Sequence, residues 1–398
     1  MQRKRTLFSI LGAVKWLGVA LLMVCSLLGT LAIVEGTLRL FPSLLPEGTR
    51  LRIHWQAGDS HWYLPHPYIG HLHRADSHAS GQTARPGLEV DSIRDPWGFR
   101  NRWPWPDQVD IVAVGDSLTY SQMVEDGQAW TTLLAQGLPQ THVLNLGLIG
   151  AAPQQYLRLY ETFGIERAPK VLLVGLFLGN DLWGARQFDH WWKAGGSGSF
   201  PEFGKREPRP GVGGWLRRHL MRFHVYALAQ DVRESSRAGR LLSGKTVELA
   251  SGARLQLVPS LLAHAALYTR PESPEFALIL DTLAQIQARA QAHHTHTLIL
   301  FFPSKEEVYL PVLGEKAADL AAPFIPELHQ RGITYLDLGP AFRERAAAGD
   351  TLFFEVDGHP NARGYALIAE TVLAYLQTSA QQFGLGAQSH PPVRSKSS

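Results

Sequence analysis

The sequence predicts an α/β protein in which helices cover both faces of a parallel sheet, preceded by a membrane-spanning helix. Apolar runs of four to seven residues alternate with longer helical stretches through much of the chain. The runs are almost continuously apolar, which is typical of parallel strands buried on both faces. A separate run of nineteen uncharged residues lies near the N-terminus. Together these patterns indicate one large α/β domain attached to a membrane anchor.

Residues 16–34 are the predicted anchor. As a helix, these nineteen residues would extend about 28 Å, which matches the hydrocarbon core of a bilayer. Basic residues precede the run, so we expect segment 1–15 in the cytoplasm and the rest of this single-pass protein on the periplasmic side of an inner or cytoplasmic membrane. A cleaved signal peptide is the alternative. The run is longer than a usual signal core, however, and Thr30-x-Ala32 is a poor cleavage site.

Composition excludes several other classes of protein. The net charge of +3 is too small to indicate nucleic-acid binding, and much of the excess lies at the N-terminus. Cys25 is the one cysteine, which excludes a disulfide framework and a cysteine-based metal site in this chain. His293, His294 and His296 have ligand chemistry but no carboxylate cluster near them in the sequence, so we interpret them as a surface turn.

Strands and helices alternate after residue 110. The strands are predicted at 111–114, 142–146, 171–177, 297–302 and 333–336. The helices are predicted at 127–138, 153–164, 274–292, 314–330 and 361–378. Right-handed crossovers are expected, and loops at the carboxyl ends of the strands should border the functional site.

Three further segments surround or interrupt this pattern. Residues 35–109 are rich in Pro, Trp, His and Arg and are expected to form an irregular extracytoplasmic lead-in. The α/β domain is assigned to 110–379, with an insertion at about 184–273 between the third and fourth strands. This insertion is either an ordinary excursion or a cap that shapes a substrate groove. The polar tail 380–398 is expected to be disordered.

The triplet Gly-Asp-Ser occurs twice, and its context separates the two copies. The copy at 58–60 follows a segment without strand character, so we interpret it as a loop coincidence. The copy at 115–117 follows the predicted strand 111–114, which places Ser117 at the carboxyl end of a buried strand. There the chain can turn into a helix and present the hydroxyl to a crevice. Ser117 is therefore the candidate nucleophile.

Two candidate donors to an oxyanion follow the next two strands. Gly150 comes after the second strand, where a glycine lets a backbone N–H approach a ligand closely. Asn180 comes after the third strand and offers a side-chain amide. Each alone has an ordinary interpretation, as a turn glycine or a helix cap. Their joint occurrence downstream of Ser117 indicates a site for acyl transfer.

His359 is the candidate base, with Asp357 two residues before it. It lies on the loop that precedes an amphipathic helix, where Pro360 suits a helix start. A loop histidine is usually a surface residue. Here it has a neighbouring carboxylate and a matching nucleophile elsewhere in the chain, which favours a catalytic role.

The blocks G-D-S-L, N-x-G-x-x-G, G-N-D and D-x-H-P-N occur in this order and resemble those of the SGNH hydrolase (GDSL esterase/lipase) superfamily. More narrowly, the sequence resembles the bacterial envelope members that carry an N-terminal membrane anchor, and the resemblance covers about 95–378. It implies a flavodoxin-like three-layer α/β/α sandwich with about five strands. It implies Ser117 as nucleophile and His359 as base, oriented by Asp357. It also implies an oxyanion hole from the backbone N–H groups of Ser117 and Gly150 and the side chain of Asn180, with no metal or organic cofactor.

The spacing of the acid departs from the commonest family pattern, D-x-x-H. Val356 occupies the usual position, and Asp357 stands two residues before His359. The D-x-H spacing resembles alginate-acetylation-type members, so we interpret it as a variant. Glu355 and Asp350 remain alternative acids, and some members of the family rely on a backbone carbonyl instead.

The anchor and the resemblance together suggest a substrate. We expect ester-linked acyl groups, O-acetyl in particular, on an envelope or exported polysaccharide, with transfer to water or to a sugar hydroxyl. Trp183, Trp191 and Trp192 are candidates for stacking on sugars or for packing within the insertion. A lipase or short-chain esterase for small esters is the nearest alternative. A non-catalytic glycan-binding or scaffold subunit of a polysaccharide-export machinery is an alternative of another class.

Overall fold

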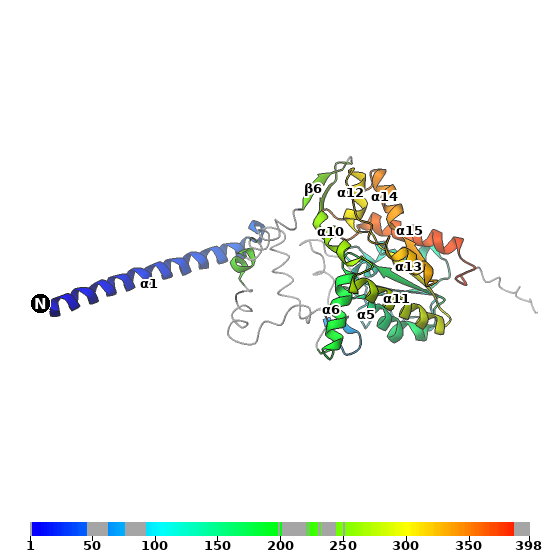
Figure 1. Ribbon diagram of the computed structural model, residues 1–398, viewed down its shortest axis with the longest axis horizontal. Coiled ribbons are helices and arrows are strands. Elements are labelled where there is room, and N and C mark those ends of the chain that lie inside the picture. The colour runs from blue at the N-terminus through cyan, green and yellow to red at the C-terminus, as the bar shows by residue number, and fades with distance from the viewer. Residues whose placement is uncertain are drawn as a thin grey trace, which may run out of the picture. The chain divides into compact units, whose positions relative to one another are not determined.

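The chain divides into two units in the computed structural model (Figure 1). One unit comprises residues 1–59 and 208–237, and the other comprises residues 60–207 and 238–398. The structure describes residues 2–45, 63–75, 93–197, 200, 220, 223–229, 232, 244–249 and 251–385. The Gly-Asp-Ser triplet at 58–60 and the predicted tail beyond residue 385 lie outside these ranges.

The first unit contains the long helix α1, Gln2–Leu40. Within it, the stretch Trp16–Leu40 is long and apolar enough to cross a membrane, and none of its most apolar part is buried against the protein. The anchor predicted at 16–34 lies inside this stretch. The N-terminal helix is therefore a candidate membrane span.

The second unit is built on a sheet of five parallel strands. In sheet order these are β4 (Val143–Gly147), β3 (Ile111–Gly115), β5 (Val171–Leu176), β8 (His296–Phe301) and β9 (Tyr335–Asp337). Every residue of β3 and β5 is buried, as expected for strands covered on both faces. The first strand lies between the second and the third, which is the flavodoxin-like order. The predicted fold class is confirmed.

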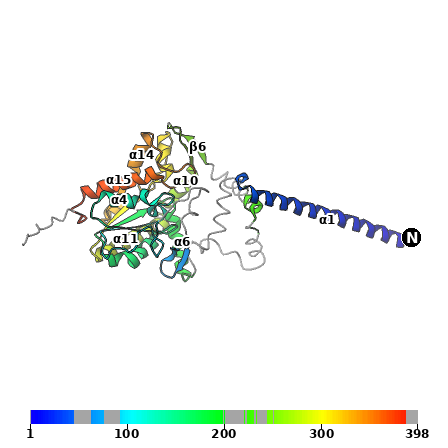
Figure 2. The same cartoon turned by 180° about the vertical axis from the view of Figure 1, so that it is seen from behind.

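Helices cover both faces of this sheet. Figure 2 shows α4 and α15 on one side of the strands and α11 on the other. The α-helices whose bounds the structure describes in this unit are α3 (Ser117–Tyr120), α4 (Trp130–Gly137), α5 (Pro153–Leu159), α6 (Asp181–Lys193), α10 (Pro259–Tyr268), α11 (Pro274–Ala292), α12 (Lys305–Val312), α13 (Phe324–Gln330), α14 (Gly339–Ala347) and α15 (Ala362–Thr378). Two antiparallel hairpins accompany them: β1 (Tyr63–His66) with β2 (Gly70–His73), and β6 (Lys245–Glu248) with β7 (Arg254–Leu257).

The helix predicted at 314–330 is wrong in its first half, since α13 begins at Phe324. The preceding residues are held as a loop by side-chain hydrogen bonds. Asp319 Oδ1 accepts hydrogen bonds from the backbone N–H groups of Ala321 and Ala322. These local bonds compete with helical ones, as aspartate side chains commonly do.

Residues 93–105 pack into this unit ahead of the first sheet strand. The side-chain amide of Asn101 pairs with both the N–H and the C=O of Asn145 on β4, at 2.8 Å each. These two hydrogen bonds satisfy the backbone N–H and C=O of Asn145, which would otherwise be unpaired at the edge of the sheet. Asp95 is buried and accepts hydrogen bonds from Asn101 and from the backbone N–H of Phe99. The segment thus closes the β4 edge beside the end of the sheet where Ser117 lies.

Candidate active site

Ser117 opens helix α3 directly after strand β3, the neighbour of edge strand β4. Asp116 caps this helix, because its Oδ1 accepts a hydrogen bond of 2.9 Å from the backbone N–H of Leu118. Gly147, at the end of β4, allows α3 to pack this closely. A Cβ on Gly147 would lie 2.3 Å from the backbone nitrogen of Tyr120. The candidate nucleophile is thus held at the carboxyl end of the sheet.

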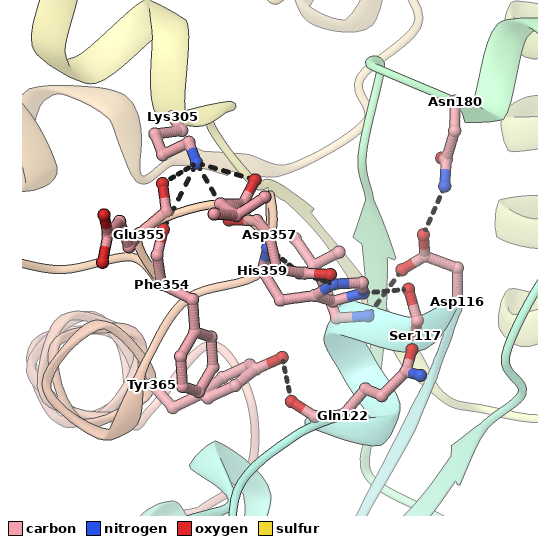
Figure 3. A network of polar contacts seen from close by, with 12 residues as sticks. Asp116, Ser117, Gln122, Asn180, Lys305, Phe354, Glu355, Asp357, His359 and Tyr365 are labelled. Carbon is pink, nitrogen blue, oxygen red and sulfur yellow. Dashed lines mark hydrogen bonds and ion pairs between the residues drawn. The ribbon is translucent and has the colours of Figure 1, made fainter. Parts of the chain in front are cut away.

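A chain of hydrogen bonds joins Ser117 to His359 and Asp357 (Figure 3). His359 Nε2 lies 2.8 Å from Ser117 Oγ, and its Nδ1 lies 2.5 Å from Asp357 Oδ1. The same carboxylate oxygen accepts a hydrogen bond of 2.8 Å from the backbone N–H of His359. This contact with the N–H two residues on forms an Asx-type turn. The turn explains how an acid with the short D-x-H spacing reaches the imidazole.

The two alternative acids have other environments. Asp350 Oδ2 accepts a hydrogen bond of 2.6 Å from Arg345 Nε. Glu355 is exposed, and its main-chain carbonyl accepts hydrogen bonds from Gln256 N and Lys305 Nζ. The carboxylate that contacts His359 is that of Asp357.

The charges around His359 favour a base that readily accepts a proton. Burial works against the charged imidazole, but the hydrogen bond to Asp357 and the charges of Asp357 and Asp116 outweigh it and raise the pKa of His359 above its usual value. Burial also works against the ionised carboxylate of Asp357. The hydrogen bonds and charge of His359 nevertheless hold the pKa of Asp357 below its usual value. An ionised acid therefore supports the imidazole, as general base catalysis requires.

Asn180 precedes helix α6, at the end of the neighbouring strand β5. Asn180 occupies the N-cap position of that helix, but its side chain makes no capping hydrogen bond to it. Instead, Nδ2 donates a hydrogen bond of 3.0 Å to Asp116 Oδ2 (Figure 3). An amide nitrogen carries two hydrogens, and this contact uses one of them. The amide is thus fixed one residue away from the candidate nucleophile.

Asp181, the acid of the G-N-D block, has a structural task that the sequence did not suggest. Its buried carboxylate accepts hydrogen bonds from the backbone N–H of Phe177 at 2.7 Å and from the hydroxyl of Tyr156 at 2.5 Å. Burial raises the pKa of this carboxyl well above its usual value, and the charge of Asp116 adds to the effect. These contacts fix the turn that carries Asn180.

Gly150 lies in a tight turn after β4. The backbone N–H of Ala151 donates a hydrogen bond of 3.0 Å to the carbonyl of Leu148, and Leu148 N–H donates one of 2.9 Å to Gly115 O at the end of β3. Gly150 has a φ of +73°, which glycine adopts at little steric cost. A Cβ on Gly150 would meet no atom within 4 Å, so the space beside it is open. Gly150, Ser117 and Asn180 thus follow three adjacent strands where the strand order reverses.

Lys305 is a buried cation that the sequence analysis missed. It opens α12 after strand β8, and its three N–H donors are shared among four consecutive main-chain carbonyls of the loop that carries Asp357 and His359 (Figure 3). These carbonyls belong to residues 354–357 and lie 3.0–3.3 Å from Nζ. Its place directly after an apolar strand, beside the loops that border the site, is the signal that could have drawn attention to it.

A cavity of about 380 Å³ lies beside Asn180. Its walls come from the start of α6, from α10 and from the loop 356–358, and are mostly apolar. Trp183, Leu261 and Val356 are exposed side chains of this lining. Because α10 belongs to the predicted insertion at 184–273, part of that insertion borders the candidate site.

The three tryptophans behind the G-N-D block have different environments. Trp191 is fully buried against Phe188 and Phe200, so it packs within the insertion. Trp192 is partly exposed, and the guanidinium of Arg158 lies 3.8 Å from its ring centroid. Trp183 is 54% exposed and lines the cavity. Among the three, Trp183 is the one placed to meet a ligand there.

The histidines near residue 294 end helix α11 and begin strand β8. His293, His294 and His296 are exposed. In the part of the chain that the structure describes, no group of three His, Cys, Asp or Glu side chains is arranged to hold a metal ion.

Comparison with known proteins adds a family assignment. Solved structures with a similar fold include a protein of the lipolytic G-D-S-L family from Desulfitobacterium hafniense DCB-2, at 12% identity, covering 67% of this chain and 99% of that one with a TM-score of 0.37. A member of the same family from Veillonella parvula DSM 2008 has 13% identity, coverage of 68% and 98%, and a TM-score of 0.35. The psychrotrophic esterase EstA from Pseudoalteromonas sp. has 12% identity, coverage of 68% and 98%, and a TM-score of 0.35.

No curated protein matches the sequence. The family comparison matches residues 113–367, which span well over half of the chain and include the segments of Ser117, Gly150, Asn180 and His359. The chain belongs to the GDSL-like lipase/acylhydrolase family.

Proposed function

We propose that this chain is a membrane-tethered serine esterase or acyl transferase, with Ser117 as nucleophile, His359 as base and Asp357 as the acid that orients it. The observation that carries the proposal is the continuous hydrogen-bonded chain from Asp357 Oδ1 through both imidazole nitrogens to Ser117 Oγ. Nucleophile, base and orienting acid in this geometry are what acyl transfer through a covalent intermediate requires. Membership of an acylhydrolase family supports the same chemistry.

The reaction proceeds in two halves. His359 Nε2 takes the hydroxyl proton of Ser117 while Oγ bonds to the carbonyl carbon of the ester. The bond to the alcohol then breaks, His359 returns the proton to the departing alcohol oxygen, and an acyl group remains on Ser117. Water or a sugar hydroxyl next gives its proton to His359 and attacks the acyl group. When the second tetrahedral intermediate collapses, the bond between the acyl carbon and Oγ breaks and His359 returns the proton to Oγ, which restores Ser117 and releases the carboxylic acid or the new ester.

The negative oxygen of each tetrahedral intermediate is stabilised by three donors. These are the backbone N–H groups of Ser117 and Gly150 and the side-chain amide of Asn180. Their support is positional, because the three residues follow adjacent strands at one end of the sheet, and Asn180 is already fixed to Asp116. Donors held in place before the reaction lose little energy in reorganising when the charge develops.

The substrate we propose is an ester-linked acyl group, O-acetyl in particular, on an envelope or exported polysaccharide. The candidate membrane span supports this location, with the α/β unit on the periplasmic side. The exposed indole of Trp183 beside the site supports a sugar, because aromatic rings offer an apolar face with a polar edge. A second candidate, a lipase or short-chain esterase, is favoured by the apolar lining of the same cavity, such as Leu182 and Leu262.

A serine-directed fluorophosphonate tests the enzyme itself. The full chain in detergent micelles should be labelled, and Ser117→Ala should not. Absence of labelling in the wild type would refute the proposal that the chain is a serine esterase or acyl transferase, and it would favour a glycan-binding or scaffold subunit. Acetate release from acetylated and bare polysaccharide, compared with hydrolysis of acetyl and octanoyl p-nitrophenyl esters, then separates the two substrate classes.

A further inference from the structure

Strand β2 carries two histidines, His71 and His73, that neither the family motifs nor the proposed mechanism uses. They are 0% and 2% exposed. Both side chains contact one residue, Ile149, which directly precedes Gly150. Two buried imidazoles on the residue before a proposed oxyanion donor call for an explanation, because burying polar rings is costly unless their hydrogen bonds are satisfied.

The two imidazoles bond the two backbone groups of Ile149. His71 Nε2 lies 3.0 Å from the carbonyl oxygen of Ile149. His73 Nε2 accepts a hydrogen bond of 3.2 Å from the backbone N–H of Ile149. Because a carbonyl only accepts, His71 carries its proton on Nε2. Because an N–H only donates, His73 Nε2 is unprotonated.

The second nitrogen of each ring agrees with these tautomers. His73 Nδ1 donates to the carbonyl of Gly98 at 3.2 Å, and His71 Nδ1 accepts from Gln155 Nε2 at 3.3 Å. Gly98 also packs tightly here, since a Cβ on it would lie 2.5 Å from the Cβ of His73. Every nitrogen of the pair therefore has a partner, and the two rings are neutral with opposite tautomers. Burial also lowers the pKa of both histidines, which agrees with neutral rings.

Ile149 and Gly150 are the central residues of the turn closed by the hydrogen bond from Ala151 N to Leu148 O. Positive φ at the second central residue, Gly150, identifies a type II turn. Types I and II differ by a flip of the central peptide, which here consists of Ile149 C=O and Gly150 N–H. That peptide is planar and trans, so its C=O and N–H point in opposite directions.

We propose that His71 and His73 are positioning residues that hold the Ile149–Gly150 peptide in the orientation in which Gly150 N–H meets the oxyanion. His71 binds the carbonyl end of the peptide and thereby fixes the direction of the N–H at its other end. His73 binds the preceding N–H and stops the turn from rotating as a whole. This inference rests on the proposed role of Gly150 as an oxyanion donor.

The surroundings make β2 a rigid support for this purpose. The ring of His73 packs edge-on against Tyr120 of the nucleophile helix α3, with centroids 5.1 Å apart. His71 packs edge-on against Tyr63 of β1, with centroids 4.8 Å apart. The hairpin therefore connects the helix that carries Ser117 with the turn that carries Gly150.

A matched pair of amides tests the proposal at His71. In His71→Gln, the side-chain amide reaches the position of Nε2 and can donate to Ile149 O. In His71→Asn, the amide stops near Nδ1 and falls short of it. We expect kcat for an acetyl ester to stay within about threefold of wild type in the Gln variant and to fall about 10- to 100-fold in the Asn variant, below the 100- to 1000-fold typical of a lost oxyanion donor. KM should change little in both, because the donor acts on the transition state.

Controls separate positioning from folding. Leu72→Ala removes a buried side chain from the same strand without touching a contact to Ile149, so it should lower the melting temperature and leave kcat unchanged. If His71→Asn does not fold, the comparison is repeated at His73, where Gln retains an acceptor for Ile149 N–H and Leu does not. Equal kcat values in the folded variant that keeps the bond to Ile149 and the folded variant that loses it, at His71 or at His73, would overturn the inference. Wild-type protein that neither reacts with a fluorophosphonate nor hydrolyses esters would instead refute the proposed function.

Discussion

Lys305 Nζ lies 3.0 Å from the main-chain carbonyl oxygen of Asp357, and it bonds the three preceding carbonyls of the same loop as well. A single buried ammonium group thus holds the backbone that presents both Asp357 and His359 (Figure 3). The conformation of the loop at residues 354–357 is thus stabilised by the ammonium group of Lys305, which belongs to helix α12.

Replacement of Lys305 by Met should therefore misplace the base. We expect kcat to fall about 10- to 100-fold, since a displacement of about 1 Å in catalytic groups can cost on the order of 100-fold. The free energy of unfolding should fall by about 1–3 kcal/mol, because the main-chain carbonyls of this loop lose their shared donor. Steady-state kinetics and thermal unfolding measure the two effects. Lys170→Met, which removes a surface ion pair with Asp110, is the control and should leave kcat unchanged.

The acid is tested by three parallel substitutions. Asp357→Asn keeps the shape of the side chain but removes the charge beside His359 Nδ1. We expect kcat to fall by about 1000- to 10,000-fold, as when a triad acid no longer fixes the tautomer of its histidine. Glu355→Gln and Asp350→Asn should retain wild-type kcat. A large loss in either of these, with Asp357→Asn active, would move the acid to another residue.

The pH profile of kcat/KM should report His359. The base must be neutral, so activity falls as pH decreases through its pKa, which lies above the usual histidine value. Loss of the Asp357 charge removes the main cause of that increase. In Asp357→Asn the acid limb should therefore shift to lower pH while the maximum rate falls. An acid limb at the same pH in both proteins would assign it to another group.

The sequence predicted those parts of the structure that depend on local pattern. The strands that begin at Ile111, Val171 and His296 are almost continuously apolar, and each is found within one or two residues of its predicted bounds. Ser117 follows strand β3, and the loop before α15 brings Asp357 and His359 to it, where they form the predicted hydrogen-bonded chain. The order of the short sequence motifs along the chain was enough to propose these three residues.

What the sequence could not supply is the set of contacts between distant segments. His71 and His73 stand almost 80 residues before Ile149, and nothing in a short hairpin sequence identifies that partner. Lys305 binds carbonyls about 50 residues away, and main-chain carbonyls have no signature in a sequence. Such buried polar contacts are set by the tertiary fold, so they become visible only in the structure.

The buried histidines should make stability depend on pH. Burial lowers the pKa of His71 to about 4, and Gln155, His73 and Tyr63 face it. In the unfolded chain the pKa of His71 is near 6.5. As pH falls from 6.5 towards 4, the unfolded state therefore takes up a proton that the folded state does not, and the free energy of unfolding decreases. The difference between the two pKa values corresponds to about 3 kcal/mol.

Urea denaturation of wild type and His71→Gln at pH 7 and pH 4.5 measures this contribution. The wild type should lose more stability between the two pH values than the variant, because the glutamine does not titrate. His190→Gln, at an exposed histidine of α6, should behave as wild type. Equal losses in wild type and His71→Gln would show that His71 is not held neutral by the fold.

Asn180→Ala tests the side-chain donor of the proposed oxyanion hole. Removal of one such donor typically slows turnover about 100- to 1000-fold, so kcat should fall in this range while KM changes little. Because Asn180 Nδ2 also donates to the buried Asp116, the variant should lose about 1 kcal/mol of stability, measured by thermal unfolding. The rate of fluorophosphonate labelling at Ser117 should fall with kcat, since phosphonylation also develops charge on an oxygen near the same donors. Unchanged kcat and labelling in a folded variant would remove Asn180 from the mechanism and leave it only the hydrogen bond to Asp116.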